Sequence, residues 1–259
     1  MLGVIVNCIL IIVGSLIGSL FKKASKYEVP IKRVLGLSTM FIGINSVVKA
    51  MGNKDVSVIL FLVSLVLGAF IGEIIKVDKG FENIGNFISK LVTKKSSEEE
   101  STEDIIEKDI ILNSGESKKG KFSYAFATAS ILYITGSMAI LGPLQGGLSH
   151  DYSMLFTKGI LDGTFAIIMV GSLGIGVGFS IFPVFVYEGA IALLAGLITP
   201  FITTASMDGV SAVGGAIVTA IGLDMLGVRI NYANLSPAMF LPIIYFLPVV
   251  QKLIHIFIK

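Results

Sequence analysis

Long runs of apolar residues, separated by short polar segments, dominate the chain. Eight of these runs are long enough, or nearly so, to cross about 30 Å of hydrocarbon as a helix. They lie at about 2–21, 34–51, 56–75, 122–142, 153–180, 183–203, 210–228 and 236–256. No segment alternates apolar with polar residues, as the wall of a β-barrel requires. The pattern therefore predicts an all-α membrane protein with about eight transmembrane helices.

Several of these runs contain residues that disfavour a continuous helix. Relative to Ala, Gly costs about 1 kcal/mol and Pro about 3 kcal/mol in a helix interior. We therefore expect helix breaks at Gly136, Ser137, Gly142, Pro143, Gly174 and Gly176. The eighth run carries Pro237, Pro242 and Pro248, which predict a kinked or partly unwound span. Broken membrane helices leave backbone groups free to bind a small ion or solute.

The two ends of the chain resemble each other. The second and seventh runs share one spacing of two glycines and a polar residue: Gly36, Gly43 and Asn45, and Gly215, Gly222 and Asp224. The first and sixth runs nearly match in the same way, with Asn7 and Gly14 against Glu188, Gly189 and Gly196. Five crossings separate the copies, so spans 1–3 and 6–8 would be inverted repeats, which place a substrate site where the halves meet. The alternative is that glycine-rich apolar helices resemble one another by composition alone.

The basic residues predict the orientation in the membrane. The loop 22–33 holds 5 of the 20 Lys and Arg, the stretch 76–121 holds 9, and Arg229 adds one. Cytoplasmic loops of membrane proteins are enriched in Lys and Arg. We therefore expect these segments in the cytoplasm and both termini outside it.

One polar insert divides the chain into segments. Residues 96–121 hold 8 of the 18 acidic residues, which predicts a disordered cytoplasmic linker. Before it, apolar residues at helical spacing predict an amphipathic helix, either lying in the membrane interface or docked on the bundle. The expected organisation is an N-terminal membrane repeat, this helix and linker, a central two-span unit and a C-terminal repeat: 1–76, 77–121, 122–182 and 183–259.

The overall composition excludes several classes of protein. Only 15% of residues are charged, against about 25% in an average soluble domain. The net charge of +2 comes with no cluster of basic and aromatic residues, so nucleic acid is not an expected partner. No phosphate-binding loop, nucleophile elbow or set of residues with metal-ligand spacing occurs. We therefore expect neither an enzyme nor a bound metal or cofactor, beyond Na+ or H+ as a coupling ion.

Polar side chains inside the spans are the candidate functional residues. A charge at the bilayer centre costs on the order of 2.5–3.5 kcal/mol on insertion scales. The candidates for binding a substrate or ion are Asn7, Asn45, Gln145, Lys158, Asp162, Glu188 and Asp224. Asp224 is expected to lie deepest, and Lys158 and Asp162 share one helix face.

Each candidate also has a structural alternative. Lys158 and Asp162 could form an ion pair near the outer surface, and Glu188, which follows Pro183, could lie near the cytoplasmic interface. The two asparagines could serve only as hydrogen-bond partners between helices.

Several short motifs resemble a known family. They are GSMAILG at 136–142, GL at 147–148, LDG at 161–163, GIG at 174–176, YEG at 187–189 and GGAI at 214–217, with Lys158. These resemble the YqgA/YdfK-like family of bacterial inner-membrane proteins, a domain of unknown function (DUF554). The likeness covers nearly the whole chain except 96–121. It implies a location in the bacterial plasma membrane, and an amide at position 188 in many relatives.

These observations favour a secondary transporter of a small solute, coupled to protons or sodium, with alternating access between inverted halves. A channel for ions or solutes is one alternative, and a membrane scaffold or sensor acting through the acidic insert is another. The expected partners are the lipid bilayer and a small molecule or ion, with a homo-oligomer as a further possibility.

Overall fold

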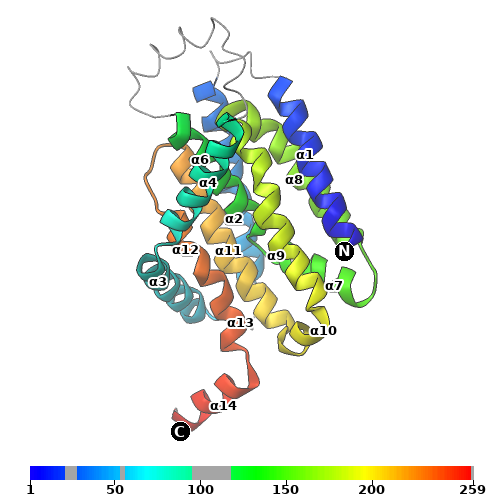
Figure 1. The fold of residues 1–259 in the computed structure, drawn as a ribbon. Coiled ribbons are helices and arrows are strands. Elements are labelled where there is room, and N and C mark those ends of the chain that lie inside the picture. The colour runs from blue at the N-terminus through cyan, green and yellow to red at the C-terminus, as the bar shows by residue number, and fades with distance from the viewer. Residues whose placement is uncertain (21–27, 53–55, 95–117, 258–259) are drawn as a thin grey trace, which may run out of the picture.

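The computed structural model describes residues 1–20, 28–52, 56–94 and 118–257. In these ranges the regular structure is helical, without strands (Figure 1). Six segments are long and apolar enough to cross a membrane: α1 (Leu2–Leu20), Lys32–Met51 of α2 (Glu28–Met51), α3 (Val58–Ile75), α8 (Ser153–Leu173), Ile175–Leu193 and α11 (Thr204–Met225). The predicted all-α membrane fold is confirmed.

The predicted fourth span is a bent pair of helices, which adds a possible seventh crossing. Helices α6 (Lys118–Ile134) and α7 (Met138–Leu148) meet at an angle of 59°. Between them Gly136 has a φ of 104°, a conformation that favours glycine. The chain thus bends where Gly136 and Ser137 were expected to interrupt the helix.

Gly142 and Pro143 do not break the helix, so that expectation is wrong. Both lie inside α7, which continues to Leu148. A Cβ on Gly142 would lie 3.2 Å from the Leu155 side chain, so this glycine serves close packing of α7 against α8. Pro143 is also buried, and tertiary packing here overrides the helix propensity.

The boundary between the fifth and sixth spans differs from the predicted one. Helix α8 ends at Leu173, because Gly174 follows with a φ of 98°. The 3₁₀ segment η2 (Ile175–Ser180) then leads into α9 (Ile181–Leu193), and the two make one crossing. Pro183 lies in the first turn of α9, where a missing backbone N–H costs little, and therefore does not mark the start of the span.

The C-terminal part of the chain is a series of short helices. After the short elements α10 (Ala195–Ile198) and η3 (Thr199–Phe201), and then α11, come α12 (Tyr232–Leu235), η4 (Ser236–Phe240), α13 (Leu241–Tyr245) and α14 (Pro248–Phe257). In Figure 1, α14 projects from the lower end, toward which the N-terminal end of α1 also points. None of the described pieces after α11 is long enough to span a membrane alone, so an eighth crossing stays a prediction.

The predicted amphipathic helix corresponds to α4 (Val77–Lys94), which follows α3 directly. It packs on α6 through Gly85, where a Cβ would lie 2.9 Å from Ser123, and through the rings of Phe81 and Phe126. Of the acidic linker predicted at 96–121, residues 96–117 lie outside the described residues, whereas residues 118–121 form the start of α6, so the linker ends earlier than predicted.

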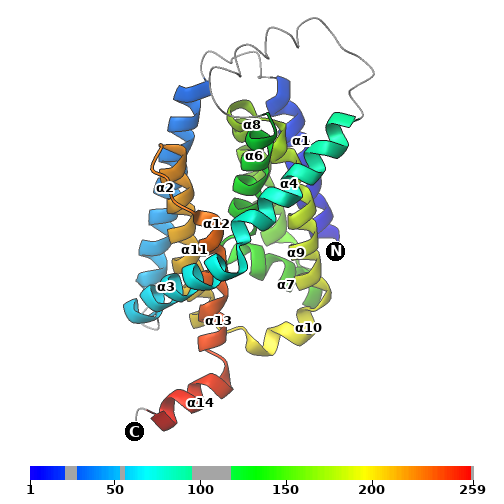
Figure 2. The ribbon, with the colours of Figure 1, turned by 60° about the vertical axis from the view of Figure 1, so that its left-hand side comes forward.

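The helices pack in two groups (Figure 2). The first helix group contains α1, α6, α7, α8, η2 and α9, and the second helix group contains α2, α3, α11, α12, η4 and α13. The groups meet mainly where α2 contacts α8, with smaller contacts of α6 with α11 and α12. Each group therefore behaves as a packing unit of its own.

Glycines bring the main helix pairs into close contact. In the first helix group, a Cβ on Gly14 of α1 would lie 2.1 Å from the carbonyl oxygen of Gly163 in α8. In the second helix group, α2 and α11 run antiparallel, and Gly36 meets Gly222 while Gly43 meets Gly215. Small residues of this kind let membrane helices approach backbone to backbone.

Candidate functional site

Four of the predicted polar residues meet in one buried cluster, formed by Asn7, Lys158, Asp162 and Glu188. The Nζ atom of Lys158 lies 3.0 Å from Oε1 of Glu188 and forms a salt bridge with Asp162. The Nδ2 atom of Asn7 lies 3.0 Å from each carboxylate oxygen of Glu188. Between 0% and 8% of the surface of these four residues is exposed. Three helices of the first helix group, α1, α8 and α9, thus contribute to one polar centre.

The spacing along α8 and its small residues explain the cluster. Lys158 and Asp162 are four residues apart, so their side chains emerge on one helix face. Gly159, the neighbour of Lys158, faces α1, and a Cβ there would lie 3.1 Å from Cα of Asn7. A larger residue at 159 would push α1 away and remove Asn7 from Glu188.

The cluster has unequal charges. With both acids ionised, one ammonium faces two carboxylates, which leaves a net charge of −1 in a buried place. Burial of an ion costs on the order of several kcal/mol unless partners compensate it. In addition, the Oδ1 atom of Asn7 is buried without a hydrogen-bond partner among the described residues. With both acids ionised, the cluster would therefore carry one excess negative charge, and Asn7 offers one acceptor without a partner among the described residues.

Glu188 lies deeper than the sequence indicated. Its side chain is fully buried, and it lies inside a span that begins at Ile175 rather than at the start of a span near residue 183. The ion pair of Lys158 and Asp162 does form, but it is buried and continues to Glu188. It is therefore part of the cluster rather than a separate surface pair.

Asp224, expected to be the deepest charge, lies elsewhere. It is the penultimate residue of α11 and is half-buried, because α11 ends at Met225 rather than near 228. Its Oδ2 accepts a hydrogen bond of 2.8 Å from the hydroxyl of Tyr124. It lines a cavity of about 290 Å³ with Asp78, Glu82, Gly120, Ser123, Tyr124, Ala127, Asn231, Tyr232 and Ala233.

The other residues of this cavity were not among those predicted from the sequence. Asp78 accepts a hydrogen bond from the Asn231 side chain, and its backbone N–H donates to Asn234. Two features of the sequence could have indicated them. Asp78 lies in the first turn of a predicted helix, and Asn231 and Asn234 have the spacing of a helix N-cap.

Besides Asp224, two further predicted site residues do not join the cluster. Asn45 is exposed on the outer face of α2, and Gln145 is half-buried in α7. The predicted break residues Gly174 and Gly176 lie at the junction of α8 and η2, where a Cβ on Gly176 would lie 2.4 Å from the Phe122 carbonyl oxygen. No group of three or more His, Cys, Asp or Glu among the described residues is arranged to hold a metal ion.

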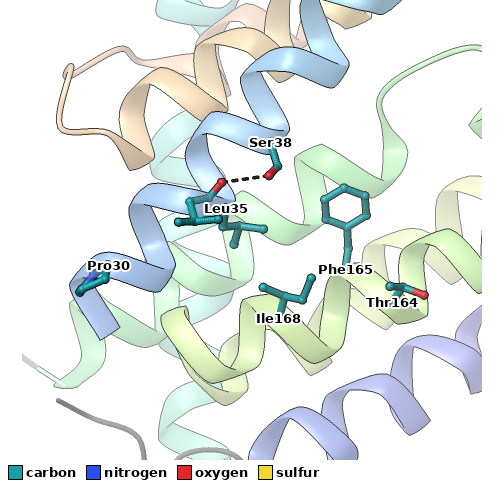
Figure 3. Close-up of a pocket in the computed structure, with 7 residues that line it drawn as sticks. Pro30, Leu35, Ser38, Thr164, Phe165 and Ile168 are labelled. Atoms are coloured by element: carbon teal, nitrogen blue, oxygen red, sulfur yellow. Dashed lines mark hydrogen bonds between the residues drawn. The ribbon is translucent and has the colours of Figure 1, made fainter. Parts of the chain in front are cut away.

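A second cavity of about 540 Å³ lies where the two helix groups meet (Figure 3). Its lining is almost wholly apolar: Pro30, Val34, Leu35 and Ser38 of α2, and Thr164, Phe165 and Ile168 of α8. The hydroxyl of Ser38 donates to the Val34 carbonyl oxygen and so is satisfied within its own helix. Because 63% of Val34 and 43% of Ile168 are exposed, this cavity opens to the outside of the helix bundle, and the contact surface between α2 and α8 is only partly filled.

Comparison with known proteins places the chain in a family. The family model described as "Protein of unknown function (DUF554)" matches residues 2–247. "Uncharacterized membrane protein YdfK" of Bacillus subtilis (strain 168) is 31% identical over 260 residues, covering 99% of this chain and 98% of the relative. "Uncharacterized protein YqgA" of Escherichia coli (strain K12) is 28% identical over 243 residues, covering 93% and 94%. No solved structure matches. The chain belongs to the DUF554 family of membrane proteins, as the sequence motifs indicated.

Proposed function

We propose that this protein is a secondary transporter of a small solute in the bacterial plasma membrane, coupled to a cation gradient. The observation that carries the proposal is the buried cluster of Asn7, Lys158, Asp162 and Glu188. Ionisable residues inside membrane spans are rare and mark pathways of ions or substrates. A purely structural role would be met at lower cost by apolar residues of similar volume.

The charge imbalance of the cluster supports coupling to a cation. A site with one excess negative charge is stabilised by a cation, and binding of that cation changes the charge that has to be buried. Such a change biases a two-state protein by the difference in affinity between the states. The nearly complete burial of Lys158 and Glu188 favours a carrier with an occluded site over an open channel.

The packing supports alternating access between two units. The cluster lies wholly within the first helix group, and the cavity of Figure 3 separates α8 of this group from α2 of the other. A loosely filled apolar contact surface allows one packed unit to slide or rotate against its neighbour, as in shear motions. We therefore expect the cluster to move with the first helix group.

Reciprocal contacts support the proposed inverted repeat. If Gly36 corresponds to Gly215 and Gly43 to Gly222, a twofold axis exchanges the Gly36–Gly222 contact with the Gly43–Gly215 contact, and both occur. Asn7 and Glu188, which correspond to within one residue, also meet across the two halves. The correspondence ends at Gly196, which lies in the short α10, whereas its counterpart Gly14 packs in the centre of α1.

An uptake screen tests the proposal. Purified protein in proteoliposomes is offered labelled organic acids, amino acids and small cations, under proton and sodium gradients in turn. We expect one class to accumulate above the level of protein-free vesicles and only while a gradient is imposed. Rapid gradient-independent flux would identify a channel, and no flux for any class would favour a scaffold or sensor.

A further inference from the structure

We propose that the ion bound by the cluster is a proton, shared by Asp162 and Glu188, and that Lys158 excludes sodium from the site. Coupling of this proton to solute movement rests on the proposed function, but binding of the proton does not. It can be tested on the purified protein without any transported solute.

Lys158 occupies the position that a metal cation would need. Its Nζ atom contacts Asp162 and lies 3.0 Å from Glu188, so the ammonium already bridges the two carboxylates. A sodium ion bound to the same oxygens would be a near neighbour of this ammonium, and like charges at such distances repel strongly in a buried site. A proton avoids this conflict, because it bonds to a single oxygen and needs no coordination shell.

The charge count requires one proton and no more. Lys158 balances one carboxylate, and a proton on the other makes the cluster neutral. Asn7 supports this arrangement, because its buried Oδ1 lacks a donor among the described residues while its Nδ2 faces Glu188. A protonated carboxyl is a donor, and amide and carboxylic acid groups can exchange two hydrogen bonds.

The other ionisable groups around the cluster do not compete for this proton. Cys8 of α1 has its Sγ 4.0 Å from the carbonyl oxygen of Ile181. Tyr133 of α6 donates to Met169, and the hydroxyl of Tyr187 of α9 is buried without a partner among the described residues. Neutral thiols and phenols are not bases near neutral pH.

The other elements that pack against α8 include α7, η2 and α2. Helix α7 and segment η2 carry no ionisable residue. On α2, Lys32 lies over the Tyr124 ring, and Arg33 and Lys49 are exposed. The two carboxylates are therefore the sites for the proton.

Infrared difference spectroscopy of the protein in lipid vesicles tests this directly. Acidification should produce the carbonyl stretch of one buried carboxylic acid per chain, with the same size in sodium and in choline buffer. Glu188→Gln should abolish this signal, and so should Asp162→Asn, because each leaves one carboxylate balanced by Lys158. Asp224→Asn, which removes a half-buried carboxylate outside the cluster, should keep it. Lys158→Met should instead double the signal, since two carboxylates would then lack a cation.

Three results would overturn the inference. One is a sodium-dependent change in the carboxylate bands that Glu188→Gln removes, which would identify a sodium site. Another is a wild-type spectrum without any buried acid signal on acidification. The third is a signal that persists in both Glu188→Gln and Asp162→Asn. If the signal is present as expected but no solute is taken up, the proposed transport alone fails.

Discussion

Lys158 is held from two directions, by a carboxylate one turn along its own helix and by one from α9. The first contact can be read from the sequence, since Lys158 and Asp162 are spaced i, i+4. The contacts of Glu188 with Lys158 and Asn7 cannot, because 181 residues separate Asn7 from Glu188 and only the assembled fold brings them together. Polar residues within apolar runs thus identified the candidates, but only the fold shows that four of them are in contact.

Loss of the ammonium should be severe. Lys158→Met leaves the two buried carboxylates of Asp162 and Glu188 without a cation. Removal of one partner from a buried ion pair costs about 3–5 kcal/mol. The unfolding free energy in detergent, measured at neutral pH, should fall by about that amount. Adding Asp162→Asn should restore part of it, since this removes one unbalanced charge. Equal stability of Lys158→Met and the parent protein would show that the carboxylates do not depend on Lys158.

The two asparagines should differ sharply in their contributions. Asn7→Ala removes the amide that donates to Glu188, and an unsatisfied buried acceptor costs about 1–3 kcal/mol. Asn45→Ala is the matched control, because Asn45 is exposed on α2 and changes there should stay within about 0.5 kcal/mol. Thermal unfolding of both variants provides the comparison, and a similar loss in both would contradict the contact.

At the scale of elements, the sequence predicted helices well and boundaries poorly. Continuous apolar runs located α1, α3 and α8, because a membrane helix needs little more than length and hydrophobicity. The helix break at Gly174 was expected and is where α8 ends, but the fifth apolar run was drawn on to residue 180 because hydrophobicity continues past this glycine. The sixth span begins at Ile175 rather than at residue 183, because Pro183 lies in the first turn of α9, where a proline is compatible with a helix.

The close packing of α1 against α8 should depend on the absence of a side chain at Gly14. In Gly14→Ala the new Cβ would lie 2.1 Å from the Gly163 carbonyl oxygen, so α1 must move, at a cost of about 1–3 kcal/mol. Gly171→Ala in α8 meets no atom within 4 Å, and should be neutral or stabilising by up to about 1 kcal/mol. Denaturation of both variants checks this, and a destabilised Gly171→Ala or an unchanged Gly14→Ala would contradict the packing.

At the scale of the whole molecule, the two helix groups and the distribution of charge suggest how the protein sits and moves. The first helix group contains all four members of the cluster, while the second contains the α2–α11 pair. Membership in the two helix groups does not follow chain order. Helix α1 packs with α9, whereas α2, which directly follows α1, packs mainly with α11 of the second helix group. Such an arrangement could not be read from hydropathy, which reports spans but not their neighbours.

Topology is the first test at this scale. The excess of basic residues in the loops 22–33 and 76–121 predicts that both termini lie outside the cytoplasm. Reporter fusions after Lys259 and within 96–121 should therefore report opposite sides of the membrane. Activity on the same side for both would exclude an eighth crossing in the predicted orientation.

If the cluster couples solute movement to a cation gradient, Glu188→Gln should uncouple the two. With a solute from the uptake screen, accumulation under an imposed gradient is compared with exchange at equilibrium, in the parent protein, Glu188→Gln and the exposed-loop control Asp151→Asn. We expect Glu188→Gln to retain exchange but no longer to accumulate solute above equilibration, while the control behaves like the parent. Gradient-driven accumulation by Glu188→Gln at the level of the parent protein would contradict it.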